Sequence, residues 1–197
     1  MKERTLINGF WCTAPNTLRI HLAGLSEEAR GVTKAPSTRR IAQAAVLSAL
    51  TVALSPLYIP LGATKCFPAQ HMMNAVAGVL LGPWYAAAMA LATGTIRNMF
   101  SLGTLYAYPG GIPGALVVGL THRYLKKMDV AALAEPLGTV VIGATLSALL
   151  LAPALGHSMT LYFFWVAFAA SSVPGSVLGY LVIKTVRRLG FDQYFHE

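Results

Sequence analysis

Long apolar runs dominate the chain, and charged residues interrupt them only rarely. Uncharged stretches cover residues 41–64, 66–96, 98–122 and 136–183. About 20 consecutive apolar residues are enough for an α-helix to cross the hydrocarbon core of a bilayer. The pattern therefore predicts an all-α membrane protein that crosses the bilayer several times.

Prolines, glycines and charges divide these runs into six predicted transmembrane helices. The second of them is short, about 22 Å as a helix, and a re-entrant segment is the alternative for it. The predicted spans are Ile41–Leu61, Pro68–Gly82, Pro83–Leu102, Ile112–Tyr124 with its flanks, Val130–Pro153 and Met159–Val186.

Clusters of basic residues indicate the topology. Arg39 and Arg40 precede the first span, and Arg123, Lys126 and Lys127 follow the fourth. Cytoplasmic loops carry the excess of Lys and Arg, so an even number of crossings must separate two cytoplasmic clusters. Counting the short second helix as a span satisfies this condition. We therefore expect a six-helix bundle in the plasma membrane, with both termini in the cytoplasm and outward loops at 62–67, 103–111 and 154–158.

Composition agrees with a membrane protein. The chain is 55% hydrophobic and 11% charged, against roughly 25% charged residues in an average soluble domain. The net charge of +8 would suit a nucleic-acid binder, but the cations flank the apolar runs and do not share one soluble face. Cys12 and Cys66 are far apart and form no CxxC motif, so we expect no disulfide framework.

The first 38 residues differ from the rest, being polar and weakly periodic. They lack the apolar core of a signal peptide, and their composition is typical of a flexible extension. The alternative is a natural start further downstream, for instance at Val32. We expect the transmembrane domain to cover residues 39–188, followed by a cytoplasmic tail at 189–197.

The segment "GATKCFPAQHMMNA", residues 62–75, concentrates polar groups between apolar runs. It places Gln70, His71 and Asn74 near the outer end of the second helix. Arg97 and Asn98 reach a similar depth, about 21 Å along the third helix. Polar side chains within a bilayer usually face the bundle interior or a cavity, so we expect an outward-facing polar pocket. Simple interhelical hydrogen bonding is the alternative.

The distribution of acids bears on what such a pocket would bind. All seven carboxylates map to the cytoplasmic side or near it, and Glu135, within the fifth span, lies near the inner end. We therefore expect no carboxylate in the outer half and a preference for a neutral or anionic solute. Lys65 and Arg97 could equally be interfacial cations. A metal site from Cys66 and His71 is disfavoured, because the CxxxxH spacing brings no further ligands.

Several functional motifs are missing from the chain. It contains no GxxxxGK[ST], HExxH or GxSxG. It also lacks a chain of intramembrane carboxylates and inverted repeats, which secondary transporters commonly use. An autonomous pump is therefore disfavoured. Ala45, Ala49 and Ala53 recur at a spacing of four on the first helix, which suits close packing against another helix or another subunit.

These features together resemble the S components of energy-coupling factor (ECF) transporters. More narrowly, "GATKCFPAQHMMNAVAGVLLGPWYA", "IRN" and "GTLYAYPGGIPGAL" resemble the ThiW family, whose members are assigned to uptake of the thiazole precursor of thiamine. The resemblance covers about residues 39–188, most densely 62–115. It implies a non-enzymatic subunit without a cofactor, which binds solute at the outer face. A transmembrane T component and two ATPases, which use the ATP, would be its partners.

The resemblance also implies roles for particular residues. Docking on the T component would use the alanine motif, here Ala45 and Ala49 extended by Ala53. The loops that cover the ligand would be Lys65–Pro68, Tyr106–Gly111 and Gly156–His157.

For 5-(2-hydroxyethyl)-4-methylthiazole, an apolar pocket with a few polar groups is suitable. His71 and Asn74 would bind the ring nitrogen or the hydroxyl group, beside Gln70. Arg97 and Asn98 would line or gate the pocket, and Tyr108 or Trp165 would stack on the thiazole ring. Lys65, in the first covering loop, completes the candidates. Alternatives are an S component for another vitamin or precursor, a membrane enzyme that acts on a lipid-borne phosphate, and a membrane scaffold.

Overall fold

The computed structural model describes residues 5–7, 10–12, 38–61, 64–126 and 128–190. The chain divides into two compact units, Met1–Ser37 and Thr38–Glu197. In the first unit, β1 (Thr5–Ile7) and β2 (Phe10–Cys12) form an antiparallel pair. The expected flexibility of the extension and most of the expected C-terminal tail fall on residues outside those described.

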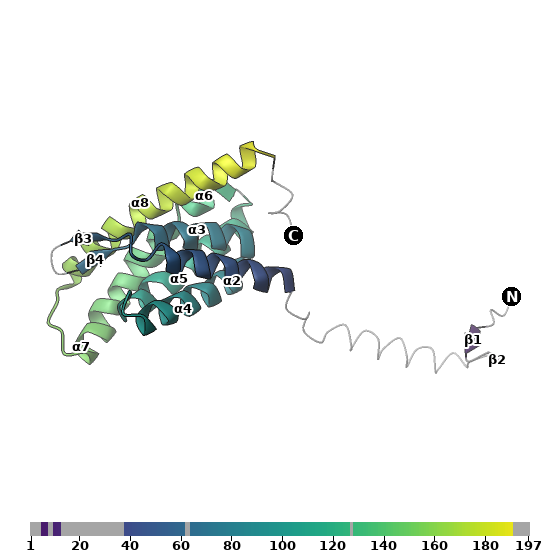
Figure 1. The fold of residues 1–197 in the computed structure, drawn as a ribbon, viewed down its shortest axis with the longest axis horizontal. Helices are drawn as coiled ribbons and strands as arrows, with labels where there is room; N and C mark the ends of the chain where they lie inside the picture. Colours follow the sequence, from purple (N-terminus) through teal and green to yellow (C-terminus); the bar gives the residue numbers. More distant parts are fainter. Residues whose placement is uncertain (1–4, 8–9, 13–37, 62–63, 127, 191–197) are drawn as a thin grey trace. The chain divides into compact units, whose positions relative to one another are not determined.

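The second unit is helical, and its helices follow one another with short connections (Figure 1). An interrupted helix runs from residue 128 to residue 154 and contains two stretches of π-type turns, η1 and η2. The segments are α2 (Thr38–Ala53), α3 (Pro68–Leu81), α4 (Pro83–Met99), α5 (Ala107–Leu125), α6 (Met128–Ala132), η1 (Leu137–Ala144), η2 (Ser147–Leu151), α7 (Ala152–Ala154) and α8 (Leu161–Arg188).

Two of the described helical segments, Asp129–Ala154 and Leu161–Arg188, are long and apolar enough to cross a membrane by length and composition. The protein is thus an all-α membrane protein with two short hairpins. The predicted segments Pro68–Gly82 and Pro83–Leu102 correspond to α3 and α4. Gly82, with a φ of 81°, separates these helices, a backbone conformation that glycine adopts without strain.

The first helix is shorter than predicted. Instead of continuing to Leu61, α2 ends at Ala53, and the chain then forms a hairpin of β3 (Ile59–Leu61) and β4 (Thr64–Cys66). In the hairpin, Ile59 lies opposite Cys66. Pro56 and Pro60 have no backbone N–H to donate and disfavour helical geometry in the residue before them, which accounts for the early end.

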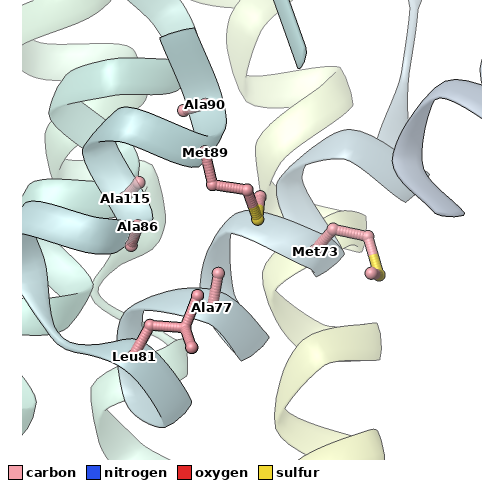
Figure 2. Close-up of a cluster of buried hydrophobic side chains, with 7 residues drawn as sticks. All are labelled: Met73, Ala77, Leu81, Ala86, Met89, Ala90 and Ala115. Carbon is pink, nitrogen blue, oxygen red and sulfur yellow. The ribbon is translucent and has the colours of Figure 1, made fainter. Parts of the chain in front are cut away.

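Helix α3 is the central element, because it packs against α2, α4, α5, α6 and α8. Figure 1 shows it between α8 and α5. Small side chains allow the close approach. One core cluster joins α3, α4 and α5 through two methionines, a leucine and four alanines (Figure 2): Met73, Ala77, Leu81, Ala86, Met89, Ala90 and Ala115. The polar residues at the start of α3 are therefore surrounded by other helices.

The interrupted helix packs closely along α5. A Cβ atom at Gly138 would lie within 2.6 Å of the Pro113 carbonyl carbon, so only glycine fits there. A comparable contact joins Gly143 to the backbone at Pro109. π-Type turns are rare and occur often at functional sites. In this protein the first such stretch, η1, begins two residues after Glu135, which is completely buried.

Candidate functional site

A cavity of about 320 Å³ lies among the start of α3, the end of α4, the start of α5 and the first half of α8. Its size falls in the range of small-molecule sites. Most of its wall is apolar or aromatic, and a few polar side chains interrupt it. The aromatic residues in the wall are Phe67, Tyr106, Phe163, Phe164 and Phe168.

Each of the three segments expected to cover a ligand contributes to this cavity. Lys65 and Phe67 come from the hairpin and the residue after it, Tyr106 from the start of α5, and His157 from the connection between α7 and α8. The Tyr106 hydroxyl lies 2.7 Å from Nδ1 of His157 and joins two of these segments. Partial burial raises the pKa of Tyr106, so its phenol remains a neutral hydrogen-bonding group at physiological pH.

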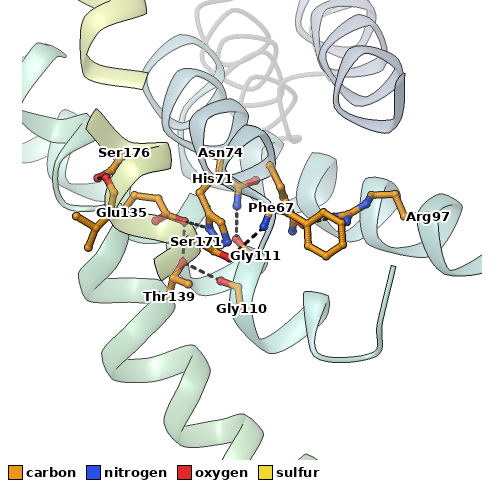
Figure 3. Close-up of polar contacts among 12 residues, drawn as sticks. Phe67, His71, Asn74, Arg97, Gly110, Gly111, Glu135, Thr139, Ser171 and Ser176 are labelled. Carbon is orange, nitrogen blue, oxygen red and sulfur yellow. Dashed lines mark hydrogen bonds and ion pairs between the residues drawn. The ribbon is translucent and has the colours of Figure 1, made fainter. Parts of the chain in front are cut away.

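Arg97 lies in the cavity wall as a buried cation, with 1% of its surface exposed. Its Nη1 donates to Oε1 of Gln70, and its Nη2 lies 3.5 Å from the Leu102 carbonyl oxygen. The guanidinium carbon is 4.1 Å from the centre of the Phe67 ring (Figure 3). No carboxylate among the described residues forms an ion pair with it. Arg97 thus faces the bundle interior, unlike a cation that snorkels to the membrane surface.

His71 is buried next to a carboxylate, which sequence reasoning did not foresee. Its Nδ1 is 2.7 Å from Oε1 of Glu135, and Oγ1 of Thr139 is 2.6 Å from the same oxygen (Figure 3). Glu135 is completely buried. The sequence placed Glu135 near the inner end of the fifth span, away from His71, and the contact between the two side chains shows that this separation was wrong.

The antiparallel register of two helices explains this error. Ala131 and Ala132, on the interrupted helix, share a core cluster with Ala75 and Val79 of α3. One turn further along the interrupted helix, and one turn back along α3, the chain reaches Glu135 and His71.

Four of the predicted site residues lie outside the cavity wall. Asn74 is buried behind it, where Nδ2 donates to the Gly111 carbonyl oxygen at 3.2 Å. Asn98 is partly buried at the end of α4. The Tyr108 hydroxyl bonds Thr95, and the Trp165 indole bonds Thr145, each at 3.3 Å. Tyr108 and Trp165 are therefore not the aromatic residues that line the cavity.

The aromatic wall was missed for an identifiable reason. Phe163, Phe164 and Phe168 lie in a long apolar run of α8, where many side chains are exposed and only some turn inward. Residue type does not distinguish a lipid-facing phenylalanine from one that lines a cavity. Phe67 was noted as one of several aromatics near the outer surface, and its contact with Arg97 identifies it as a wall residue.

The predicted alanine motif lies on the outer surface of the bundle. Ala45, Ala49 and Ala53 are all exposed, whereas Ala44 and Leu47 on the same helix pack against the core. The three alanines therefore share a face of α2 that no other described element covers.

Metal-binding groups do not cluster in the described part of the chain, where no three His, Cys, Asp or Glu residues could hold one ion. Cys66 is buried, and its Sγ lies 3.9 Å from the Ala167 carbonyl oxygen. The cavity instead combines an aromatic wall with Gln70, His71 and Arg97, a composition suited to binding a small planar solute.

Comparison with known protein families matches residues 41–189 to the family described as thiamine-precursor transporter protein (ThiW). The match begins in α2 and extends through the end of α8, so it includes every residue of the cavity wall. No curated protein matches the chain.

Proposed function

Because the chain belongs to the ThiW family of thiamine-precursor transporters, we propose that it is the substrate-binding subunit of an ECF importer for 5-(2-hydroxyethyl)-4-methylthiazole. Membership in the family makes it a membrane transport protein for a small molecule. The particular substrate and the ECF partnership are the proposal.

The observation that carries the proposal is the composition of the cavity. Five aromatic rings offer flat apolar contact to a heteroaromatic ring. Gln70, His71 and Arg97 supply hydrogen-bonding groups on one side of the same space. Asn74 supports the site from behind by bonding the Gly111 backbone, and Lys65 lies at the hairpin, where it would help to cover a bound ligand.

The partners in this proposal are those that the resemblance to ECF S components implies, and the outer face of α2 supports one of them. The exposed stripe of Ala45, Ala49 and Ala53 would contact the T component, since small side chains let another helix approach closely. Two ATPases would provide the energy. In this proposal the chain crosses the plasma membrane six times with both termini in the cytoplasm, as the basic clusters favour. It acts as a binding subunit and not as an enzyme.

An alternative from another class has one observation in its favour. A membrane enzyme that acts on a lipid-borne phosphate would need an acid near His71 and Arg97, and Glu135 supplies one beside His71. An S component for another vitamin or precursor is the nearer alternative.

Binding measurements on the purified protein in detergent or nanodiscs separate these functions. We expect saturable binding of radiolabelled thiazole alcohol, weaker binding of thiamine and riboflavin, and recovery of the thiazole unchanged. The absence of thiazole binding, or conversion of an added phospholipid, would contradict the proposal. Tight binding of riboflavin or thiamine in place of the thiazole would instead assign another substrate to the same kind of subunit.

A further inference from the structure

The buried pair of His71 and Glu135 carries an inference about how the cavity orients its ligand, which rests on the proposed function. We infer that Glu135 and Thr139 are positioning residues that hold His71 with its proton on Nδ1. The free Nε2 then accepts a hydrogen bond from the hydroxyl group of the substrate. The site would consequently select small heteroaromatic alcohols over analogues that lack the hydroxyl.

The first step is the contact between imidazole and carboxyl group. Nδ1 of His71 faces Oε1 of Glu135 at 2.7 Å, and a carboxylate oxygen can only accept. With Oε1 as the acceptor, the proton of this hydrogen bond lies on Nδ1, which is the arrangement that we infer. In a neutral imidazole the other nitrogen, Nε2, is then an acceptor.

The second step concerns the support of the carboxyl group. Oγ1 of Thr139 lies 2.6 Å from Oε1 of Glu135 and 3.0 Å from the Gly110 carbonyl oxygen. A threonine hydroxyl has one proton to donate. In the arrangement that we infer, this proton goes to Oε1 of Glu135, so Thr139 holds the carboxyl group in place. Glu135 and Thr139 are both completely buried and lie outside the cavity wall. They would act on the ligand through His71, as groups that hold an imidazole in one orientation do at other sites.

The third step is the position of Nε2. His71 lines the cavity, and none of its described hydrogen bonds involves Nε2. Gln70, the preceding residue, contacts Arg97 with its Oε1. The polar side of the cavity thus has an acceptor at His71 and donors at Arg97. A ligand with a hydroxyl donor and a ring-nitrogen acceptor matches both.

Other charged or polar groups face the same space as His71. They are Arg97 from α4, Lys65 from β4, His157 from the connection before α8, and Tyr106 before α5. Arg97 and Lys65 can only donate hydrogen bonds, so neither of them competes with Nε2 of His71 as the acceptor for the hydroxyl group of the ligand.

The test compares two ligands on matched variants of the full chain. The ligands are the thiazole alcohol and 5-ethyl-4-methylthiazole, which lacks only the hydroxyl group. The variants are Glu135→Gln, Thr139→Val and the control Asp129→Asn, which changes a carboxylate near the start of the same interrupted helix. Asp129 pairs with Arg187 and lies outside the cavity.

We expect the unmodified protein to prefer the alcohol by about tenfold or more, as sites built around a hydroxyl do. Glu135→Gln should lose most of this preference, because its amide N–H can donate to Nδ1 and move the imidazole proton to Nε2. Thr139→Val should reduce the preference partly, and Asp129→Asn should keep it. In ¹⁵N NMR spectra, His71 should show protonated Nδ1 in the unmodified protein and the other tautomer in Glu135→Gln.

Equal affinity for the two thiazoles in the unmodified protein would overturn the inference while leaving the proposed function intact. An unchanged preference in a folded Glu135→Gln protein would also overturn it. Should that variant fail to fold, the two-ligand comparison and the His71 spectrum of the unmodified protein still decide. No binding of either thiazole would contradict the proposed function itself, and the inference with it.

Discussion

Arg97 shows at the scale of one residue how the chain holds a cation within an apolar bundle. A buried charge is costly unless hydrogen bonds or an opposite charge compensate it. Here the compensation comes from Gln70, the Leu102 carbonyl oxygen and the face of Phe67. Gln70 thus positions the guanidinium group that we assign to the ligand site.

Gln70→Ala should therefore destabilise the protein in the absence of ligand. The substitution removes the Oε1 acceptor and leaves part of the guanidinium group unpaired, at a cost of about 2 kcal/mol. Thermal unfolding in detergent would measure the loss. Gln43→Ala, the same substitution at a partly exposed position of α2, is the control and should change stability by less than about 0.5 kcal/mol. Similar unfolding temperatures for the two variants would show that Gln70 does not support Arg97.

The contact between α3 and α8 is decisive at the scale of elements, because it places the first turn of α3. Gly175 and Gly179 on α8 allow the approach. A Cβ at Gly175 would lie 2.6 Å from Cβ of His71, and one at Gly179 would lie 2.7 Å from Cβ of Ala75. Small residues at helix interfaces permit such packing in membranes. The position of His71 in the cavity thus depends on a glycine of another helix.

Gly175→Ala should both destabilise the bundle and weaken ligand binding. The added methyl group forces α3 and α8 apart, which typically costs about 1–3 kcal/mol, and it moves the side chain of His71. Thermal unfolding and titration with the thiazole alcohol would measure the two effects. The control is Val173→Leu, which adds a methylene group at an exposed position of α8. It should change neither stability nor affinity. Unchanged stability and affinity in Gly175→Ala would contradict the dependence of the His71 position on this contact.

At the scale of the whole molecule, the face of α2 that the bundle leaves uncovered matters most. Its small residues lie beside the exposed Val46 and Leu50. A lipid-facing surface needs no stripe of alanines, because any apolar side chain satisfies lipid. A partner helix, by contrast, gains from a flat surface that it can approach closely.

Ala49→Trp should abolish uptake of thiazole by cells while leaving binding by the purified protein unchanged. The bulky ring would block the T component at α2, and Ala49 is not among the residues that line the cavity. Leu150→Trp, at an exposed position of η2, is the control for a large lipid-facing side chain and should transport normally. Transport by Ala49→Trp cells at the normal rate would refute the assignment of this face to the T component.

The sequence by itself determined the features that depend on neighbouring residues. Apolar runs with proline and glycine breakpoints placed α3 and α4 within a few residues, because helix formation and termination are local. The polar residues Gln70, His71 and Arg97 were predicted to lie together, and all three line one cavity. Their convergence could be inferred because polar groups in an apolar bundle must face its interior.

Only the tertiary structure decided which groups meet across helices. It turned Phe163, Phe164 and Phe168 inward and brought Glu135 against His71. These outcomes depend on the rotation and axial register of each helix, which the close glycine contacts of α5 and α8 set. Since such contacts join residues far apart in the chain, no local pattern reveals them. The carboxylate that we infer to orient the ligand is therefore the residue that sequence reasoning had placed elsewhere.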